Sequence, residues 1–295
     1  MDIAKRMGKE VTVVAEDDIL ETATANELCP NVDMVVSMGG DHTFLRSQAL
    51  LPDRTVPIVG INTRRGTFEG VLNTQYIDHE FKETMTTNLL ELLEDESAVS
   101  YEKRSRILFE SQVGGENAPL KRVMCLNETL CAEKDVSSAS RYVVEKNGSN
   151  VGPFKSSGLI ISTGTGSTGW LYSVRQITPY QLEAIQNILG SMGDASLELN
   201  EPLAEELSKE TIFRRDRDEM YYCVREGFSF TTGASEGFAK QMTIKSEMID
   251  GQAVVDGWFR TDLSLGDSFS LTADPKYALR VANVEVFGNP APSGY

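Results

Sequence analysis

The stretch that decides the fold is Val35-Val36-Ser37-Met38-Gly39-Gly40-Asp41-His42-Thr43. With Met34 before it, it opens as the apolar run of a buried strand and continues directly into two glycines, a carboxylate and a hydroxyl. Apolar residues then return at helical spacing, at Phe44, Leu45, Ala49, Leu50 and Leu51. The stretch therefore predicts a strand, a tight turn and the start of a helix.

The turn itself has the composition of a phosphate-binding loop. Adjacent glycines let a backbone turn sharply and bring its N–H groups close to a ligand. Such groups at a helix N-terminus bind phosphate. A carboxylate does not suit phosphate unless it handles a proton or a metal, so Asp41 is the residue that needs a function. The alternative is a purely structural junction in which Asp41 or Thr43 is the N-cap of the helix.

Composition limits the classes of protein that the chain can belong to. Its 295 residues, 40% of them hydrophobic, can bury a full core in one or two domains. The net charge of −16 argues against a nucleic-acid partner or an anionic membrane. No apolar run is long enough to span a bilayer, and no signal or transit peptide is visible at the start.

The cysteines indicate no zinc site. Cys29, Cys125, Cys131 and Cys223 show no C-x-x-C spacing, so we expect reduced and mostly buried thiols in an intracellular protein.

The first hundred residues favour an α/β domain. Val11–Val14 and Pro57–Asn62 predict further strands, and Ile3–Met7 reads as the end of a helix. Strands alternating with helices predict a parallel, doubly wound sheet whose ligand crevice lies at the carboxyl ends of the strands. Gly39–Asp41 and Gly60–Thr63 both fall on that edge. Because such domains normally begin with a strand, we expect this one to lack its first strand.

A second, β-rich part is predicted to follow the helix at Phe81–Glu96. Its short strands are predicted at Ile107–Phe109, Val123–Leu126, Tyr142–Val144, Leu159–Ser162, Met220–Val224, Met242–Ile244, Ala253–Val255 and Ser268–Leu271. Short strands separated by turn residues favour an antiparallel sandwich or layered sheet.

Two helices interrupt these strands. One is predicted at Pro179–Leu189 with Gly190 as its stop, and the other at Glu201–Lys209 with Asn200 as its cap. We expect an α/β domain at 1–98, a β-rich dinucleotide-binding domain at 99–275, and a tail at 276–295 that can return to the first domain.

Three further stretches carry chemistry. Asn127–Glu128 places an amide and a carboxylate at a strand end, either as a polar edge or to hold a sugar hydroxyl and an amide. The stretch from Lys155 to Trp170 opens from a strand into glycines between hydroxyls, which could line phosphates or riboses, with Trp170 closing one wall. Asp256–Gly257 between two β runs is first a type I′ hairpin turn and only second a ligand contact.

Together these stretches resemble the NAD kinase family, and most closely its branch of mitochondrial NAD kinase 2 and plant NADH kinases. The resemblance rests on Gly-Gly-Asp-x-Thr at 39–43, Gly-Ile-Asn-Thr at 60–63, Asn-Glu at 127–128, the stretch 156–168 and the late Asp-Gly at 256–257. Gly-Gly-Asp alone is shared with lipid kinases, whereas the ordered set of five is specific. Ser156-Ser157-Gly158 and Val224-Arg225-Glu226 fit the mitochondrial branch.

The resemblance implies a function and a site. It implies transfer of a phosphoryl group from ATP, with Mg²⁺, to the adenosine ribose 2′-hydroxyl of NAD(H), giving NADP(H), by a homodimer. It also implies a mitochondrial location, with a cytoplasmic one as the alternative. Asp41 would be the catalytic carboxylate, Gly39, Gly40 and Thr43 would face phosphates, and no residue is assigned to a metal. The implied NAD-binding residues are Asn62, Asn127, Glu128, Ser157, Thr165, Thr168, Gly169, Trp170 and Asp256.

The implied chemistry agrees with the residues. A ribose hydroxyl is a poor nucleophile, so a carboxylate placed to accept its proton helps. The rest of the acceleration should come from positioning and charge neutralisation. The available cations are Arg46, Arg64, Arg65, Arg141 and Lys155.

One departure from the family pattern bears on activity. His42 stands where the family motif Gly-Gly-Asp-Gly has its last glycine, and a left-handed backbone there would cost a histidine about 1–2 kcal/mol. On that basis His42→Gly is expected to raise kinase activity, or at least not to lower it. The alternative function is a catalytically weak NAD(H)-binding homologue with a regulatory or structural role. A lipid kinase would leave Asn127–Glu128 unexplained.

Overall fold

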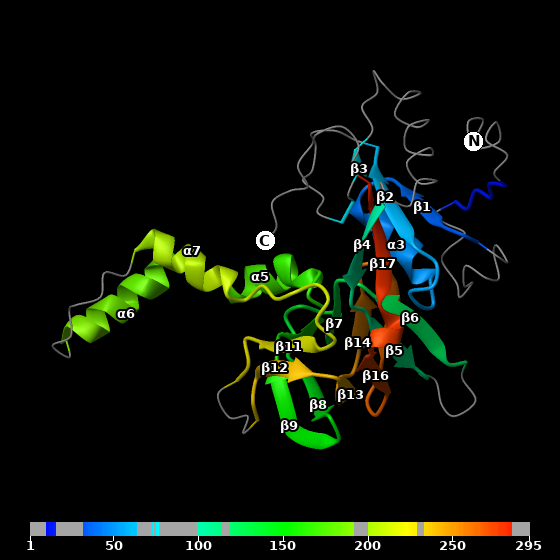
Figure 1. The fold of residues 1–295 in the computed structure, drawn as a ribbon. Helices are drawn as coiled ribbons and strands as arrows, with labels where there is room; N and C mark the ends of the chain where they lie inside the picture. The colour runs from blue at the N-terminus through cyan, green and yellow to red at the C-terminus, as the bar shows by residue number, and fades with distance from the viewer. Residues whose placement is uncertain are drawn as a thin grey trace.

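The computed structural model describes residues 10–15, 32–63, 72–73, 75–76, 99–113, 119–191, 200–228 and 233–284. These residues form a small sheet that carries the glycine turn, stacked end to end with a larger β-sandwich (Figure 1). Within them, no helix combines the length and hydrophobicity needed to cross a membrane.

The small sheet, called here the N-terminal sheet, contains β1 (Val35–Met38), β2 (Ile58–Asn62), β3 (Gln75–Tyr76), β4 (Val99–Arg104) and β17 (Leu279–Val284). Its order is β1-β2-β17-β4, with β3 also on β2. Every residue of β2 is buried, as expected for a central strand of a parallel sheet. Its pairs with β1, β3 and β17 are parallel. The predicted α/β part is confirmed, although the β17–β4 pair is antiparallel and makes the sheet mixed.

Both ends of the C-terminal part return to this sheet. β4 begins at the first residue of the predicted second domain, and β17 lies in the predicted tail, yet both pair within the N-terminal sheet. The described chain therefore leaves this sheet after β4, builds the sandwich, and comes back at β17. The domain limits themselves stay predictions.

The sandwich consists of two antiparallel sheets. One contains, in order, β12 (Glu236–Ala239), β11 (Met220–Arg225), β10 (Gly158–Ser162), β7 (Glu128–Glu133), β14 (Gly251–Val255) and β15 (Phe259–Leu263). The other contains β6 (Lys121–Cys125), β5 (Ile107–Ser111), β16 (Ser268–Ala273), β13 (Gln241–Ser246), β8 (Ser140–Lys146) and β9 (Ser149–Ser156). All eight predicted strands of this part are present, and the predicted antiparallel β-rich class is confirmed.

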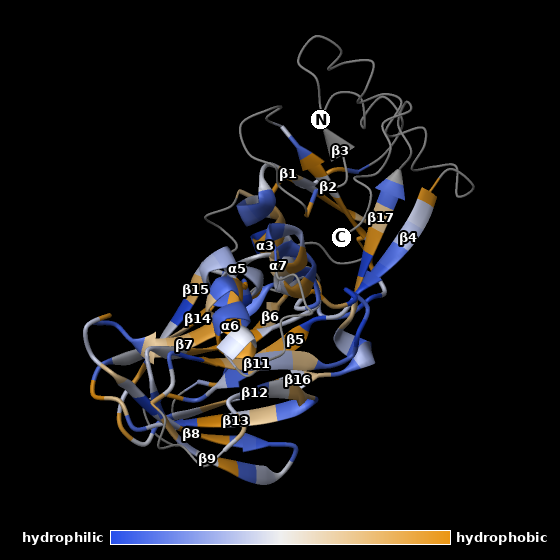
Figure 2. Cartoon of the chain, turned by 90° about the vertical axis from the view of Figure 1, so that its left-hand side faces the viewer, coloured by the Kyte–Doolittle hydropathy of each residue, from blue (hydrophilic) through white to orange (hydrophobic). Residues whose placement is uncertain are grey.

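The core of the sandwich lies between its two sheets. β13 alternates strictly between exposed and buried residues, so one of its faces enters the core. Figure 2 shows this alternation as bands of hydrophobic and hydrophilic residues along the strands. A second cluster, built from Phe44, Leu45, Ile58, Leu126 and Leu279, joins the N-terminal sheet to the sandwich.

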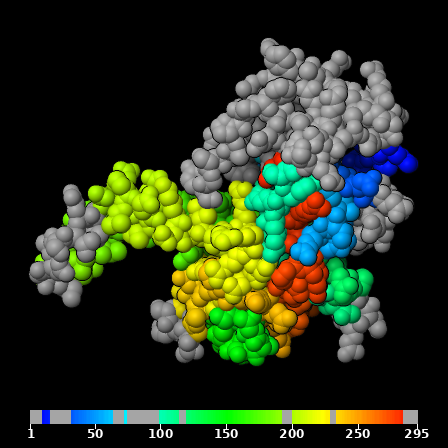
Figure 3. Space-filling view, in the orientation of Figure 1, coloured from blue at the N-terminus to red at the C-terminus, as the bar shows by residue number. Residues whose placement is uncertain are grey.

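Helix α3 (Asp41–Ala49) follows β1 and belongs to that second cluster. The other helical elements are η4 (Gly166–Thr168), α5 (Trp170–Arg175), α6 (Pro179–Ser191), α7 (Glu201–Lys209) and η5 (Pro275–Tyr277). α6 and α7 project from the body as an arm (Figures 1 and 3). The Asn200 side chain caps α7 as predicted, accepting from the Leu203 N–H at 3.2 Å.

Two local predictions are wrong. α6 continues through Gly190 to Ser191, because an interior glycine weakens a helix by only about 1 kcal/mol relative to alanine. Val11–Val14 forms no strand and is largely exposed, since no strand in the described part of the chain pairs with it.

Several expectations cannot be compared with the structure. The helices at Ile3–Met7 and Phe81–Glu96, Cys29, Arg64 and Arg65 lie outside the described residues. The residues on which the expected loss of a first strand depends lie outside them too.

Candidate active site

The glycine turn is a helix start without a side-chain cap. Gly40 is the N-cap of α3, with φ −83° and ψ −173°, and Asp41 is the first helical residue. The suggestion that Asp41 or Thr43 caps the helix is therefore wrong. The Gly39 N–H donates to the Ile61 carbonyl at 3.0 Å, which fixes the turn against the end of β2 and places it beside Asn62.

The two glycines of the turn have different surroundings. A Cβ on Gly39 would lie 2.3 Å from Thr43 Oγ1, so this position must be glycine for the turn to close on the helix. A Cβ on Gly40 would meet no atom of the described residues within 4 Å. The backbone at Gly40 therefore faces open space at a helix N-terminus, where an anion can approach.

The Asp41 carboxylate is held by a neighbouring segment. Its Oδ1 accepts from Asn73 Nδ2 at 3.1 Å and from the Leu72 N–H at 3.3 Å. Arg104, which is fully buried, in turn donates to the Leu72 carbonyl at 3.2 Å. Burial lowers the pKa of Arg104, while Glu102 and, more weakly, Asp41 oppose that shift. The position of Asp41 thus depends on residues well outside the glycine turn.

His42 does not have the backbone that the family pattern suggested. It is an exposed residue in the first turn of α3, and none of residues 39–43 has a positive φ. The expected strain at this position is therefore absent, because a right-handed helical backbone suits any L-residue with a side chain like that of histidine. The argument that His42→Gly relieves strain is wrong.

The Asp256 carboxylate organises the Asn127–Glu128 turn. It is 3% exposed and accepts backbone hydrogen bonds from Leu126 (2.8 Å), Asn127 (2.8 Å) and Glu128 (3.1 Å). Asp256 and Gly257 have φ values of 49° and 74°, and the Trp258 N–H donates to the Val255 carbonyl at 3.1 Å. The predicted type I′ turn is confirmed, and its carboxylate points into the protein.

The glycine-rich loop packs against the same turn. The Thr163 N–H donates to the Asn127 carbonyl at 2.9 Å, and the Thr163 hydroxyl donates to the Leu126 carbonyl. A Cβ on Gly166 would lie 2.3 Å from the Asn127 carbonyl oxygen, and one on Gly164 would lie 2.0 Å from that of Arg214. These two glycines therefore let the loop pack closely against the backbone of Asn127 and of Arg214.

Among the described residues, the buried polar atoms of this region that have no hydrogen-bond partner include Asn127 Oδ1 and Thr165 Oγ1, together with Trp258 Nε1. A buried polar atom left unsatisfied costs about 1–3 kcal/mol. Unpaired groups of this kind in a native structure call for a ligand or a water. Asn127 and Thr165 are residues that the family resemblance assigns to the dinucleotide.

Two carboxyl groups here have raised pKa values. Burial, with a contribution from Asp256, raises the pKa of Glu128 to about 8. Burial also raises the pKa of Asp256 to about 6, although its backbone hydrogen bonds oppose the shift. At neutral pH, Glu128 is therefore largely protonated and can donate as well as accept a hydrogen bond.

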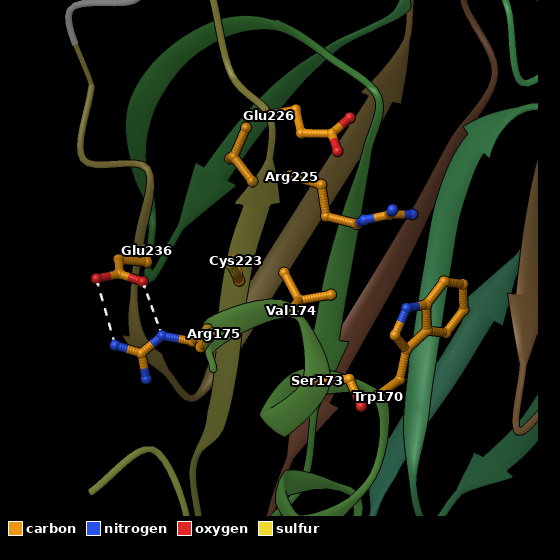
Figure 4. Close-up of a pocket in the computed structure, with 9 residues that line it drawn as sticks. Trp170, Ser173, Val174, Arg175, Cys223, Arg225, Glu226 and Glu236 are labelled. Atoms are coloured by element: carbon orange, nitrogen blue, oxygen red, sulfur yellow. Dashed lines mark hydrogen bonds and ion pairs between the residues drawn. The ribbon is translucent and has the colours of Figure 1, made fainter. Parts of the chain in front are cut away.

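The candidate residues after the glycine-rich loop are more exposed to solvent. Thr168 is half-buried, and Gly169 and Trp170 are exposed. Trp170 borders a groove of about 640 Å³ whose wall includes Arg175, Arg225 and Glu236 (Figure 4). The Arg225 guanidinium lies 5.4 Å from the centre of the Trp170 ring.

Ser157 is not brought to the Asn127 turn within one chain. It precedes Gly158, which is at one end of β10, whereas Ser162 at the other end pairs with Glu128. Among the cations, Arg46 is on α3, 5.9 Å from the Trp258 ring centre. Arg141 and Lys155 are on β8 and β9, at the far edge of the sandwich.

Sequence reasoning missed Asn73, Arg104 and Gln48. Asn73 and Arg104 act on Asp41, as described above, and Gln48 donates to Asp256 Oδ2 at 3.4 Å. None stands in a recognisable pattern, but Gln48 interrupts an apolar helix face and could have been noted as a polar residue at a core position. In the described parts of the chain, no three His, Cys, Asp or Glu side chains cluster as a metal site would require.

Comparison with known proteins identifies relatives. Residues 3–89 match the family model of the ATP-NAD kinase N-terminal domain. Human mitochondrial NAD kinase 2 is 25% identical over 290 residues, which cover 86% of this chain and 65% of the relative. The chain thus spans just under two thirds of the length of that protein.

Two crystal structures share the fold. Yeast NADH kinase complexed with NADH matches with a TM-score of 0.60 at 15% identity, covering 95% of this chain and 72% of the other. An NAD kinase from Archaeoglobus fulgidus in complex with ATP matches with a TM-score of 0.57 at 18% identity, covering 96% and 88%. The resemblance to the NAD kinases and the two-part fold are confirmed.

Proposed function

We propose that this relative of the NAD kinases transfers the terminal phosphoryl group of ATP to the adenosine ribose 2′-hydroxyl of NAD(H), giving NADP(H). The observation that carries the proposal is the convergence on Asp256 of the Asn127–Glu128 turn and of α3, the helix that begins with Asp41. Similar proteins are named NAD kinase 2 and NADH kinase, and one similar crystal structure contains ATP.

In this proposal Asp41 accepts the proton of the ribose hydroxyl as its oxygen bonds to the γ-phosphorus of ATP, while the bond from that phosphorus to the bridging oxygen breaks and ADP leaves. Asn73 and the Leu72 N–H hold its carboxylate in place. Gly39, Gly40 and Thr43 form the turn that faces the phosphates, with the open approach at Gly40. Most of the acceleration then comes from alignment of the reacting groups and from neutralisation of charge on the phosphates.

The dinucleotide would bind along the glycine-rich loop. Asn127 and Thr165 each offer an unpaired polar atom, and Glu128 offers a carboxyl group. Asn62 borders the glycine turn. Thr168, Gly169 and Trp170 would form the solvent-facing wall of the dinucleotide site. Asp256 would contribute indirectly, by holding Asn127 and Glu128. Ser157 is the least supported of these contacts, because it lies at the end of β10 opposite the end that pairs with Glu128.

The glycine turn fits Mg²⁺ carried by ATP. Mg²⁺ in kinases is bound by one or two carboxylates together with the substrate's phosphates, not by a cage of protein ligands. The turn at Gly40 is open among the described residues, so the phosphates of ATP could enter there together with their Mg²⁺, while Asp41 stays the proton acceptor. Bound there with ATP, the ion would neutralise charge on the phosphates.

Three finer statements belong to the same proposal. A homodimer and a mitochondrial location are proposed from the similarity to mitochondrial NAD kinase 2. The division into 1–98, 99–275 and 276–295 is proposed as the functional organisation, with the first segment carrying the phosphate turn and the second the dinucleotide site.

The test is product formation by the purified chain. Protein is incubated with ATP and Mg²⁺ and with NAD⁺ or NADH in parallel, and NADP⁺ and NADPH are quantified. ATP-dependent formation of either product supports the proposal, whereas tight NAD(H) binding without product supports the catalytically weak homologue.

A further inference from the structure

Gln48 lies where the N-terminal sheet meets the sandwich. It is in the last turn of α3 and is fully buried. Its Nε2 donates to the Met124 carbonyl at 2.9 Å, to the Leu45 carbonyl at 3.1 Å and to Asp256 Oδ2 at 3.4 Å. One side chain of α3 thus reaches two segments of the sandwich.

The orientation of the Gln48 amide is fixed by Arg106. Arg106 Nη1 donates to Gln48 Oε1 at 3.0 Å and to the Gln48 carbonyl at 2.8 Å, and its Nε donates to the Tyr277 carbonyl at 2.6 Å. Because the guanidinium only donates, it requires the amide oxygen on its side and turns the NH₂ group toward Asp256. Arg106 is itself 1% exposed, so water does not compete for this contact.

Asp256 connects Gln48 to the Asn127–Glu128 turn. Its carboxylate receives the N–H groups of Asn127 and Glu128. A continuous chain of buried hydrogen bonds therefore runs from Arg106 through Gln48 and Asp256 to the two residues proposed to hold NAD. The same Gln48 belongs to the helix whose first residue is Asp41.

We propose that Gln48 is a positioning residue that fixes the Asn127–Glu128 turn relative to helix α3. This role rests on the proposed function. The proton acceptor and the dinucleotide contacts belong to different sheets, so their alignment depends on contacts across this junction. A displacement of about 1 Å between reacting groups can cost about 100-fold in rate.

Gln48→Glu keeps the contact with Arg106 and removes the contact with Asp256. The new carboxylate can still accept from Arg106, but it can no longer donate to Asp256 and it repels that carboxylate. We expect NAD affinity to fall about tenfold or more, measured by calorimetry, with the KM for ATP within about twofold of wild type. Gln48→Met, of similar volume and without a donor, should also weaken NAD binding, and it carries the test if Gln48→Glu does not fold.

Ser47→Ala is the matched control. Ser47 is buried on the same helix, but its hydroxyl donates to Ser37 at 3.1 Å and to the Thr43 carbonyl at 2.8 Å, both within the N-terminal part. We expect it to lower the melting temperature without changing the Kd for NAD.

The outcomes are distinguishable. Wild-type affinity for NAD in both folded Gln48 variants, or an equal loss of affinity in Ser47→Ala, overturns the positioning role while leaving the kinase proposal intact. A wild-type protein that neither binds NAD(H) nor forms NADP(H) overturns the proposed function and the positioning role with it.

Discussion

The Asn73 side-chain amide donates a hydrogen bond to Asp41 Oδ1 at 3.1 Å. The residue proposed to accept the substrate proton is therefore oriented by a segment more than thirty positions away in the chain. A Cβ on Gly60 would lie 2.6 Å from Asn73 Oδ1, so the glycine on β2 makes room for this side chain. Asp41, Asn73 and Gly60 form one packed unit at the carboxyl end of the N-terminal sheet.

Asn73→Ala should impair catalysis more than binding. Losing the donor leaves the Asp41 carboxylate less well oriented, and we expect kcat to fall about tenfold with the Kd for NAD within about twofold of wild type. Steady-state kinetics and calorimetry measure the two quantities. In Gly60→Ala the added Cβ presses on both Asn73 Oδ1 and the buried Phe44 ring, so this variant should lower the melting temperature as well as kcat. Unchanged kcat in both variants would show that Asn73 does not position Asp41.

Gly39→Ala should affect stability, whereas Gly40→Ala should affect ATP binding. The added Cβ on Gly39 collides with the Thr43 side chain, whereas the one on Gly40 meets none of the described atoms within 4 Å. We expect Gly39→Ala to lower the melting temperature clearly, and Gly40→Ala to keep it but to raise the KM for ATP, because the methyl group occupies the approach of the phosphates. A Gly40→Ala protein with wild-type KM for ATP would place the phosphates elsewhere.

His42→Gly should destabilise the protein without activating it. His42 has a helical backbone and is exposed, so glycine, compared with alanine at this position, adds backbone freedom to the unfolded chain. We expect a loss of about 0.5–1 kcal/mol relative to His42→Ala, measured by urea unfolding. If His42→Gly instead raises kcat, the turn adopts another conformation when substrate binds.

The sequence predicted local features well where a short pattern determines them. The helix after the glycine turn, the Asn200 cap and the type I′ turn at Asp256–Gly257 follow from residues a few positions apart, and each is confirmed. Strand β9 was missed because Gly152 and Pro153 interrupt its pattern.

Long-range roles were not predictable in this way. Asp256 binds the N–H groups of residues 126–128, more than one hundred positions away, and no periodicity indicates such a contact. The same holds for Asn73 and Arg104 around Asp41. The family pattern also misled at His42, since it suggested a left-handed backbone where the chain is already helical.

Glu128 should make stability depend on pH. Its pKa is about 8 in the folded protein, against an ordinary value of 4.5, so the folded state binds this proton more tightly than the unfolded state. The contribution to stability is full below about pH 4.5 and is lost as the pH rises to 8. Asp256, with a pKa of about 6, contributes in the same direction.

We therefore expect the urea midpoint of the wild-type protein to fall between pH 5.5 and pH 8. In Glu128→Gln, which keeps a neutral group of the same size, this fall should be clearly smaller. An identical pH dependence in the two proteins would show that Glu128 is ionised and solvated in the folded state.

The central claim is that Asp41 accepts a proton during ATP-dependent phosphorylation of NAD(H). The most direct test measures NADP(H) formation by wild-type protein and by Asp41→Asn, with NAD(H) binding measured for both. Asn is isosteric and still accepts from Asn73, so we expect normal binding and a kcat lower by about 100-fold or more. Wild-type turnover by a well-folded Asp41→Asn protein, or no NADP(H) from the wild type itself, would contradict the claim.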